Sequence, residues 1–305
     1  MILTVTLNPA VDQTLQFDEP LAPDRVMRAE EARFDAGGKG INVAQFLAGM
    51  DRACVATGLV GGFTGQFVRD RLADDSIPTD FVEADGPTRL NTSAIADGVE
   101  YKLNHDGPVA DDDDIEAIVE VVRRRDPDTV VVGGSLPPGV TTDAVDAIAA
   151  AGEWETIVDM DGPQLTALAG QYALCAPNDV ELADALGREL PTVEACAEAA
   201  QTFRAEGFDR VLASLGDAGA LLVTESTTLF AEPLETDVVD TVGAGDALLS
   251  GVVAAWADGA DDELALRTGV ALATLVVGRA GPTVPDREAV RELRERVTVR
   301  TLDNP

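Results

Sequence analysis

From residue 111 onward, short apolar runs that suit buried strands alternate with longer segments that suit helices. The first helix is expected at about 112–125, because acidic residues begin it and Arg123-Arg124-Arg125 end it, which complements the helix dipole. Further helices are expected at about 141–151, 179–187, 192–206, 246–257, 262–278 and 286–296, and strands at 129–132, 156–160, 172–176, 210–214, 219–223, 227–231 and 236–239. This alternation predicts an α/β fold with a mostly parallel sheet and helices on both faces.

The first third of the chain contains two segments, at about 10–35 and 85–105, in which polar and apolar residues alternate. Such alternation is typical of half-exposed strands rather than of a buried sheet. We therefore expect these segments to form a small sheet that lies over the edge of the main sheet as a lid. Because no linker or change in composition divides the chain, we expect one domain over residues 1–305.

Composition excludes several classes of protein. A formal net charge of −33 argues against binding to nucleic acid or to an anionic membrane, since both need a basic surface. A hydrophobic fraction of 46% argues against disorder, and no apolar run is long enough to span a membrane. The cysteines are too widely spaced for a disulfide framework or a metal knuckle, and the N-terminus does not resemble a signal peptide. We expect a cytoplasmic protein.

Arginine supplies nearly all of the positive charge, since the only lysines are Lys39 and Lys102. An acidic, lysine-poor composition is typical of a high-salt cytoplasm, where salt screens the repulsion between carboxylates. We therefore expect a halophilic protein that loses folding and activity in dilute buffer. If selection has removed surface lysines, the two that remain are candidates for functional roles.

A glycine-bearing turn, Asp240-Thr241-Val242-Gly243-Ala244-Gly245-Asp246, opens an apolar helix. Glycines allow a ligand to approach closely, and the first amides of a helix lack internal partners, so the turn is a natural anion site. Asp246, at the mouth of that site, suits either a helix cap or a base that accepts a proton from an attacking hydroxyl. An anion site beside a carboxylate suits phosphoryl transfer.

A second glycine-rich stretch, Gly37-Gly38-Lys39-Gly40-Ile41-Asn42, joins a lid strand to a helix. Its backbone can approach a ligand, to which Lys39 offers a charge and Asn42 a donor and an acceptor. The alternative is a turn with a surface lysine. The stretch is not a P-loop, because Gly40 stands where Ser or Thr is required, and the chain contains no Gly-x-Gly-x-x-Gly fingerprint.

Charged residues on the expected lid strands are candidates for binding a phosphorylated substrate. Asp12 follows a strand end and can accept two sugar hydroxyls, whereas Arg89 and Lys102 can bind an anion. Taken singly, each of these residues also suits a solvated charge.

Two further motifs follow strands of the expected main sheet. Asn178 and Glu181 start a helix and suit either waters around Mg²⁺ or a capping box. The stretch Ser214-Leu215-Gly216-Asp217-Ala218-Gly219 suits either a nucleotide contact or a plain hairpin turn. Ligands bind at the carboxyl ends of strands in open α/β sheets, where Asn8 and Ser135 are also expected.

These residues together resemble the ribokinase/PfkB family of sugar kinases over nearly the whole chain. The stretch from Gly37 to Ala44 resembles the N-terminal signature of that family, and the turn from Asp240 to Asp246 resembles its very specific C-terminal signature. Three stretches are similar to the phosphosugar branch: Leu7-Asn8-Pro9-Ala10-Val11-Asp12, Thr88-Arg89-Leu90-Asn91 and Gly134-Ser135-Leu136-Pro137-Pro138-Gly139. The resemblance implies a ribokinase-like three-layer α/β/α sandwich with a mostly parallel central sheet and a small β-sheet lid.

The resemblance also implies roles for individual residues. Asp246 is the implied base, and the amides of Gly243, Ala244 and Gly245 form the implied anion hole. The implied substrate ligands are Asp12, Gly38, Lys39, Asn42, Arg89, Lys102 and Ser135, and the implied nucleotide contacts are Asn178, Ser214, Gly216, Gly219 and Thr241. Asn178 and Glu181 are implied to hold Mg²⁺ through water. Asp159-Met160-Asp161-Gly162 departs from the Asp-Thr-Ser-Gly of many relatives, and Asp161 adds negative charge near the site.

The implied reaction is the ATP-dependent phosphorylation of a ketohexose phosphate, with fructose 1-phosphate giving fructose 1,6-bisphosphate. Fructose 6-phosphate and tagatose 6-phosphate stay open as substrates, because Lys39 and Arg89 do not separate one phosphosugar from another. A nucleotide- or sugar-sensing protein of the same fold is the alternative outside enzymes. ATP is the implied co-substrate with Mg²⁺, and a homodimer through the lid is the implied assembly.

Overall fold

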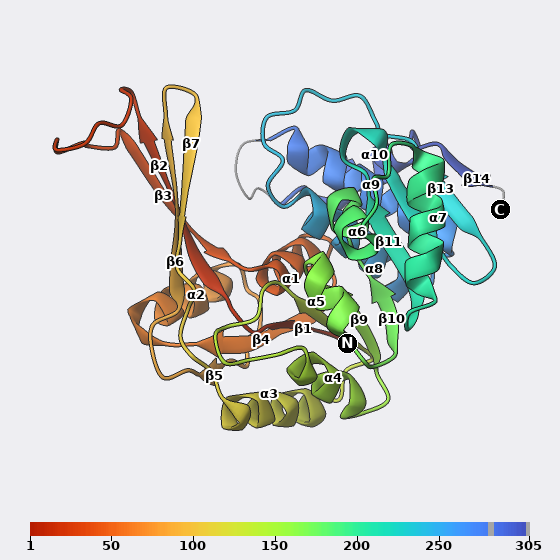
Figure 1. Cartoon of the computed structure of the whole chain (residues 1–305), viewed down its shortest axis with the longest axis horizontal. Helices are drawn as coiled ribbons and strands as arrows, with labels where there is room; N and C mark the ends of the chain where they lie inside the picture. The colour runs from red at the N-terminus through yellow and green to blue at the C-terminus, as the bar shows by residue number, and fades with distance from the viewer. Residues whose placement is uncertain (280–283, 303–305) are drawn as a thin grey trace.

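The computed structural model describes residues 1–279 and 284–302. Within them, ten strands form one sheet in the order β14-β13-β12-β11-β10-β9-β8-β1-β4-β5 and four form a second sheet in the order β3-β2-β6-β7 (Figure 1). Figure 1 shows the small sheet projecting from one end of the body, which contains the large sheet and its helices. The expected α/β class, with a large mostly parallel sheet and a second small sheet, is confirmed.

The large sheet is parallel over seven strands and antiparallel at one edge. The parallel strands are β1 (Ile2–Thr6), β4 (Cys54–Val60), β5 (Val82–Glu83), β8 (Thr129–Gly133), β9 (Glu155–Asp159), β10 (Tyr172–Cys175) and β11 (Phe208–Ser214). The antiparallel strands are β12 (Ala220–Val223), β13 (Thr228–Ala231) and β14 (Val299–Leu302). Parallel strands point the same way, so their carboxyl ends meet at one edge of the sheet.

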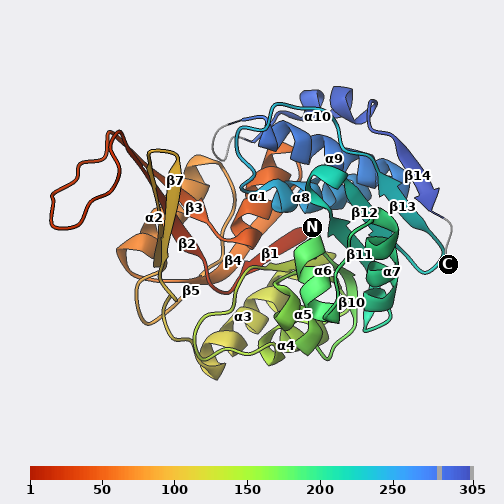
Figure 2. The same ribbon diagram turned by 45° about the horizontal axis from the view of Figure 1, so that its top comes forward.

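Helices cover both faces of this sheet (Figure 2). One face carries α1 (Lys39–Gly49), α2 (Gly62–Asp74), α8 (Ala244–Ala257), α9 (Asp262–Val277) and α10 (Arg287–Arg294). The other carries α3 (Asp112–Arg125), α4 (Asp143–Ala150), α5 (Gly162–Ala167), α6 (Asp179–Leu186) and α7 (Val193–Arg204). Side chains alternate along each strand, so Val131 joins one apolar core while Val130 and Val132 join the other.

The close crossing of α8 and α9 fixes the place of α8. A Cβ atom at Gly251 of α8 would lie 2.7 Å from the Cα of Gly269 of α9, so the two backbones touch where neither residue has a side chain. Ten consecutive residues of α8, from Asp246 to Ala255, are buried. The N-terminus of α8 is therefore held by packing along most of the helix.

The small sheet consists of β2 (Ala10–Phe17), β3 (Glu31–Gly37), β6 (Arg89–Ala96) and β7 (Val99–Asn104). Opposite residues on paired strands share a face, so the register places Asp12, Asn91 and Asn104 together on one face. On the other face, Leu15 lies beside Ala94, which lies beside Tyr101. The sheet thus has a polar face and an apolar face.

Three sequence expectations differ from the structure. Residues 236–239 form no strand, because the amide of Val239 donates to the carbonyl of Val277 at the end of α9 instead of joining a strand partner. Within the alternating segment expected at about 10–35, β2 ends at Phe17 and regular pairing resumes only at Glu31. Strand β14 was not expected from its short sequence, and it pairs with β13. In the described part of the chain, no helix is long and apolar enough to cross a membrane.

Candidate active site

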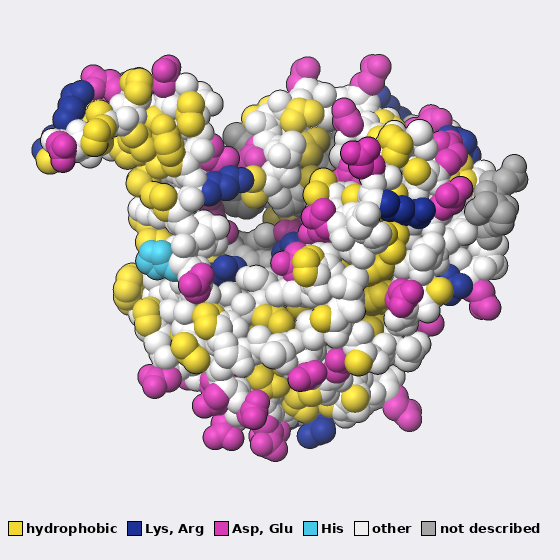
Figure 3. Space-filling model, in the orientation of Figure 1, with side chains coloured by type: hydrophobic (Ala, Val, Ile, Leu, Met, Phe, Trp, Pro, Cys, Tyr) yellow, Lys and Arg dark blue, Asp and Glu magenta, His cyan; other side chains and the backbone are white. Residues whose placement is uncertain are grey.

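The polar motifs of the sequence gather at the carboxyl edge of the parallel strands. Asp159 ends β9, Ser214 ends β11, and Asn178 forms a bridge with Ser214. The first turn of α1 meets the same edge, because Lys39 contacts Asp159 across the sheet. Figure 3 shows that the surface is hollowed between the small sheet and the body, with charged side chains of both signs around the hollow. This edge is the candidate site.

The N-terminus of α8 presents backbone amides without a side-chain cap. Gly243 adopts φ +79°, a left-handed conformation that favours glycine. The first helical bond runs from the amide of Ala247 to the carbonyl of Gly243 at 2.8 Å. A Cβ atom at Gly245 would meet nothing within 4 Å, so the helix opens toward space there. The amide of Ala244 makes a long bond of 3.3 Å to the carbonyl of Thr241, and the following amides of the first turn have no acceptor within the helix, so this helix start suits an anion.

Asp246 lies in this first turn and is only 7% exposed. Its Oδ2 accepts a 2.7 Å hydrogen bond from Nδ2 of Asn42 on α1. Burial, and then the charge of Asp159, raise the pKa of Asp246 to about 7, against the opposing effects of Asn42 and Lys39. A carboxyl with a pKa near 7 can accept a proton at neutral pH and release it afterwards. Its side chain makes no helix-capping bond, so the structure does not show the capping role that the sequence left open.

Lys39 forms an ion pair with Asp159, in which Nζ of Lys39 lies 2.6 Å from Oδ1 of Asp159. Burial is the largest single effect and lowers the pKa of Lys39, but the nearby carboxylates, Asp159 foremost, together outweigh it, and the net pKa is raised. Asp246 and Glu181 act on the same ammonium in the same direction. Lys39 thus stays charged among three carboxylates that come from different elements of the fold.

The glycines around Lys39 allow α1 to approach the end of β1. A Cβ atom at Gly38, where φ is +112°, would lie 2.7 Å from Cγ2 of Thr6, and one at Gly40 would lie 2.5 Å from Oγ1 of Thr6. Any side chain at either position would displace the helix from the strand. This contact places the first turn of α1 at the edge of the sheet where Asp159 ends its strand.

Asp12 lies near the start of β2 in the small sheet. Its Oδ1 accepts a 3.0 Å hydrogen bond from Nδ2 of Asn91, and its Oδ2 lies against Gly37, where a Cβ atom would collide with it. Burial, the largest effect, raises the pKa of Asp12, whereas Asn91 and Arg89 act in the opposite direction. Asn91 is therefore a contributor to this part of the site that the sequence prediction did not include.

Arg89 lies at the base of the small sheet without an ion pair among the described residues. Burial lowers the pKa of its guanidinium, and Asp12 and Asp106 partly oppose that effect. Its Nε atom is buried and has no hydrogen-bond partner in the described part of the chain. A partly desolvated cation with free donors suits an anionic ligand.

Lys102 stands apart from Arg89. Lys102 lies on β7, opposite Ser93 of β6. Ser93 is four residues along β6 from Arg89, which corresponds to roughly 13 Å of strand. The side chain of Lys102 is 64% exposed and pairs with Glu100 at 3.6 Å. The structure therefore does not gather Lys102 with Lys39 and Arg89 at the base of the site, as the sequence grouping expected.

Asn178 and Glu181 form a capping box at the start of α6. Asn178 Oδ1 accepts from the amide of Glu181, and Glu181 Oε2 accepts from the amide of Asn178, both at 2.8 Å. Burial is the main cause that raises the pKa of Glu181. No three acidic, His or Cys side chains of the described residues are arranged to ligate a metal directly. However, Asp159, Glu181 and Asp246 outnumber the single Lys39 among them, which suits a hydrated cation.

The predicted nucleotide contacts surround the ends of β11 and α8. After Ser214, the amide of Leu215 donates to the carbonyl of Gly219 at 2.9 Å, which closes a turn around Gly216–Ala218. Gly216 has φ +57°, and a Cβ atom there would meet nothing within 4 Å. Thr241 is exposed just before the turn into α8, and its carbonyl accepts from the amide of Ala244 at 3.3 Å.

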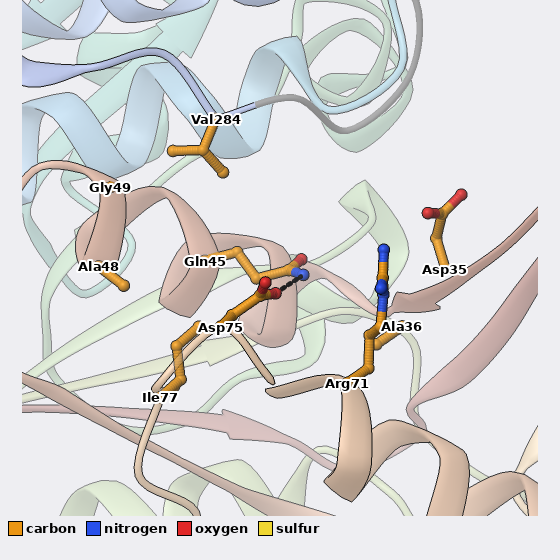
Figure 4. A pocket seen from close by; sticks show the side chains of 9 residues that line it. All are labelled: Asp35, Ala36, Gln45, Ala48, Gly49, Arg71, Asp75, Ile77 and Val284. Carbon is orange, nitrogen blue, oxygen red and sulfur yellow. Dashed lines mark hydrogen bonds between the residues drawn. The ribbon is translucent and has the colours of Figure 1, made fainter. Parts of the chain in front are cut away.

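A separate cavity lies at the foot of the small sheet between α1 and α2 (Figure 4). Its volume is about 350 Å³, and Asp35, Gln45, Arg71 and Asp75 are the polar residues that line it. Gln45 Nε2 donates to Oδ2 of Asp75 at 3.2 Å across its wall. None of the site residues predicted from the sequence lines this cavity.

Sequence reasoning gave no role to Asp159, and it placed Asn8 at the ligand-binding edge of the sheet without including it among the site residues. Asp159 ends a largely buried strand, and this position is the available signal, whereas the motif comparison singled out Asp161, which is exposed before α5. Asn8 also follows a buried strand and proves to be only 3% exposed. Its Nδ2 lies 3.3 Å from the Oγ of Ser135, the predicted substrate ligand. A polar residue at the end of a core strand indicates Asp159 by the same signal that placed Asn8 at this edge.

Comparison with known proteins places these features in a family context. The model of the pfkB family of carbohydrate kinases matches residues 5–289. A 1-phosphofructokinase from Haloferax volcanii is 51% identical over 302 residues, which cover 99% of both chains. A D-tagatose-1-phosphate kinase from Bacillus licheniformis is 34% identical over 256 residues, which cover 82% of this chain and 84% of that protein. The structure of phosphofructokinase-2 from Escherichia coli in complex with fructose-6-phosphate has a TM-score of 0.86 and 30% identity, covering 97% of this chain and 98% of that one.

Proposed function

The chain belongs to the pfkB family of carbohydrate kinases, and on that premise we propose that it phosphorylates fructose 1-phosphate at the C6 hydroxyl. ATP donates its γ-phosphoryl group, and the products are fructose 1,6-bisphosphate and ADP. The similarity to a 1-phosphofructokinase over the full length of both proteins supports this substrate. The runner-up substrates are fructose 6-phosphate, tagatose 6-phosphate and tagatose 1-phosphate, the last because of the relative from Bacillus licheniformis.

The observation that carries the proposal is a buried carboxylate in the first turn of an uncapped helix. Asp246 takes the proton of the C6 hydroxyl as the hydroxyl oxygen bonds to the γ-phosphorus, and the bond from that phosphorus to the β–γ bridging oxygen breaks. The amides of Gly243, Ala244 and Gly245 face the transferring group and stabilise its charge. A pKa near 7 lets Asp246 act at neutral pH.

The charge around Asp246 supports a role for Lys39 beside the transferring group. Lys39 acts electrostatically on Asp246 and Glu181 and is held by Asp159, so its ammonium lies among the groups of the phosphoryl-transfer site. The sequence suggested Lys39 as a ligand of the phosphate on the acceptor sugar; its pairing with Asp159 favours instead a role in which it offsets the negative charge that the nucleotide brings. Mg²⁺, which Asn178 and Glu181 would hold through water, would supply further neutralisation of the phosphates.

The acceptor sugar phosphate occupies the side of the site next to the small sheet. Asp12, Gly38 and Asn42 bind its hydroxyls, and Arg89 binds the phosphate that the substrate already carries. The Arg89 guanidinium forms no ion pair with any residue that the structure describes, which supports this assignment, because a partly buried cation is stabilised by a dianionic ligand. Closure of the small sheet over the substrate would exclude water and suppress hydrolysis of ATP.

A coupled assay of ADP release in high KCl tests the reaction. The panel contains fructose 1-phosphate, fructose 6-phosphate, both tagatose phosphates and unphosphorylated fructose, and kcat/KM is compared across it. We expect fructose 1-phosphate to give the highest kcat/KM, with fructose 1,6-bisphosphate as product. A higher value for another ketose phosphate would replace the substrate but keep the kinase. Binding of sugar phosphate without any ADP release would favour the sensing alternative.

A homodimer through the small sheet is supported by its apolar face. Phe34, Val99, Tyr101 and Leu103 all lie on this face and are between 42% and 60% exposed. Large exposed apolar patches are characteristic of association surfaces. Tyr101→Glu should therefore convert a dimer into a monomer in sedimentation velocity, whereas Val238→Glu, at an exposed valine outside the small sheet, should not.

The composition supports a working environment of high salt. A charge of −33 with only two lysines produces strong self-repulsion at low ionic strength, and salt at molar concentration screens it. ATP as the donor agrees with the cytoplasmic location expected from the sequence. The dependence of the melting temperature and the activity on salt tests this environment directly.

A further inference from the structure

We propose that Asn8 is a positioning residue that holds the phosphate-binding half of the site in place and acts through Arg89. This inference rests on the proposed function, since it concerns the phosphate that the acceptor sugar carries. Asn8 follows β1 and is 3% exposed, so its amide is almost completely removed from water. Such a buried amide is costly unless it bonds to its surroundings, and its bonds therefore report what it holds.

The Nδ2 atom of Asn8 joins three segments that are distant in sequence. It donates to the carbonyl of Asp106 at 3.0 Å and lies 3.3 Å from Oγ of Ser135 and 3.4 Å from the carbonyl of Leu136. Asp106 belongs to the loop that leads from β7 of the small sheet back to the body, and Ser135 follows β8. One amide thus connects the small sheet to two strand ends of the large sheet.

The Oδ1 atom of Asn8 defines the path of that loop. Gly107 has φ +93°, and a Cβ atom at this residue would lie 2.4 Å from Oδ1 of Asn8. The same point lies 3.7 Å from Cδ of Arg89, so Gly107 is packed between Asn8 and the stem of Arg89. Both Oδ1 of Asn8 and Nε of Arg89 are buried without a hydrogen-bond partner in the described part of the chain.

This packing gives Asn8 control over where the charge of Arg89 lies. Arg89 has a long side chain and no ion pair within the described residues, so contacts along its stem decide where the guanidinium points. Removal of the Asn8 side chain frees the carbonyl of Asp106 and opens space beside Gly107. The loop and the stem of Arg89 can then shift, and the phosphate of the substrate loses a fixed partner.

A purely structural role for Asn8 predicts a different pattern. If Asn8 only stabilised the fold, its loss would lower the melting temperature and the fraction of active protein, with the same KM for fructose 1-phosphate. If Asn8 acts through Arg89, its loss must raise that KM, and the effect must disappear once Arg89 is absent. A double-mutant cycle separates the two, because only groups that act together give non-additive effects.

The test measures steady-state kinetics of wild type, Asn8→Ala, Arg89→Ala and the double variant with fructose 1-phosphate and ATP in high KCl. Asn8→Ala should raise KM for fructose 1-phosphate about tenfold, while kcat and KM for ATP stay within about twofold. In the Arg89→Ala background, the same change should alter this KM less than about twofold. Tyr172→Phe, which removes a hydroxyl that donates to Oδ1 of Asp146 at 2.6 Å near the opposite end of the parallel strands, should lower stability and leave KM unchanged.

Each further outcome decides the inference. Multiplicative effects of Asn8→Ala and Arg89→Ala on KM would overturn it while the proposed function stands. If wild type consumes no ketose phosphate, the proposed function fails and this inference fails with it. If Asn8→Ala does not fold, Gly107→Ala gives the same readout, because its Cβ pushes on the same contact from the other side. An unchanged KM in a folded Gly107→Ala variant would also contradict the inference.

Discussion

Asn42 and Asp246 are separated by 204 positions in the chain, yet Nδ2 of Asn42 lies 2.7 Å from Oδ2 of Asp246. The bond joins the first turns of α1 and α8, the two helices that the glycine-rich stretches open. Because the amide donates to the carboxylate, it favours the charged form and lowers the pKa of Asp246. Burial acts more strongly in the opposite direction, and the balance is a pKa of about 7.

The first prediction concerns pH. If the carboxylate form of Asp246 is the base, as proposed, kcat/KM should fall with decreasing pH below a pKa of about 7. Asn42→Ala removes the donor that favours the charged form, so the acidic limb should move to higher pH. A pH profile of both proteins with fructose 1-phosphate checks this result. A limb that stays in place, or moves to lower pH, would contradict the proposed electrostatic link.

The second prediction concerns the phosphate of the acceptor. Arg89→Ala should raise KM for fructose 1-phosphate by roughly 10–100-fold, because a charge-assisted contact to phosphate contributes about 1.5–3 kcal/mol. The KM for unphosphorylated fructose should not change, since fructose offers Arg89 no anion. Parallel saturation curves with both sugars measure the difference. Equal loss with both substrates would show that Arg89 does not bind the phosphate.

The third prediction concerns the buried ion pair of Lys39 and Asp159. Lys39→Met leaves Asp159 uncompensated with a side chain only 4% exposed, whereas Asp159→Asn leaves Lys39 with 35% of its side-chain surface exposed to water. Lys39→Met should therefore be the more destabilising change, by roughly 1–3 kcal/mol, less than for a fully buried pair. Denaturant unfolding in high KCl measures both variants. Equal stability losses would mean that the desolvation of Asp159 does not control the outcome.

The fourth prediction concerns salt. At about 0.1 M salt the screening length is about 10 Å, so many carboxylates of this chain repel one another. The melting temperature and the activity should fall as KCl is lowered from molar concentration to about 0.1 M. Thermal unfolding across a KCl series, with sucrose added to one set to separate charge screening from general stabilisation, measures the effect. A melting temperature independent of KCl would contradict a high-salt origin.

The sequence predicted the layers of the fold because the main strands and helices carry strong periodic patterns. The helix expected at about 112–125 is α3, and its expected acidic start is a capping box between Asp111 and Asp114. The strand predicted at 236–239 was wrong because its β-branched residues favour a strand, whereas the backbone there bonds to Val277 at the end of α9. Val238 and Val239 are instead 66% and 58% exposed, which the apolar pattern alone did not indicate.

The glycine motifs predicted which stretches meet in the site, but not which side chains touch. The conformation of a single residue is a local property, so Gly38 and Gly243 mark positions where the backbone adopts a positive φ that favours glycine. The contacts of Lys39 with Asp159 and of Asn8 with Asp106 join residues 120 and 98 positions apart. Such pairings depend on strand order and helix packing, which a single sequence does not specify.

The most direct test of the central claim is the kcat of Asp246→Asn with saturating ATP and fructose 1-phosphate. The variant keeps the size of the side chain and cannot accept the proton of the hydroxyl. We expect kcat to fall roughly 10²–10⁴-fold or more, while KM for both substrates changes little. A folded variant that keeps kcat within about tenfold of wild type would contradict the assignment of Asp246 as the base.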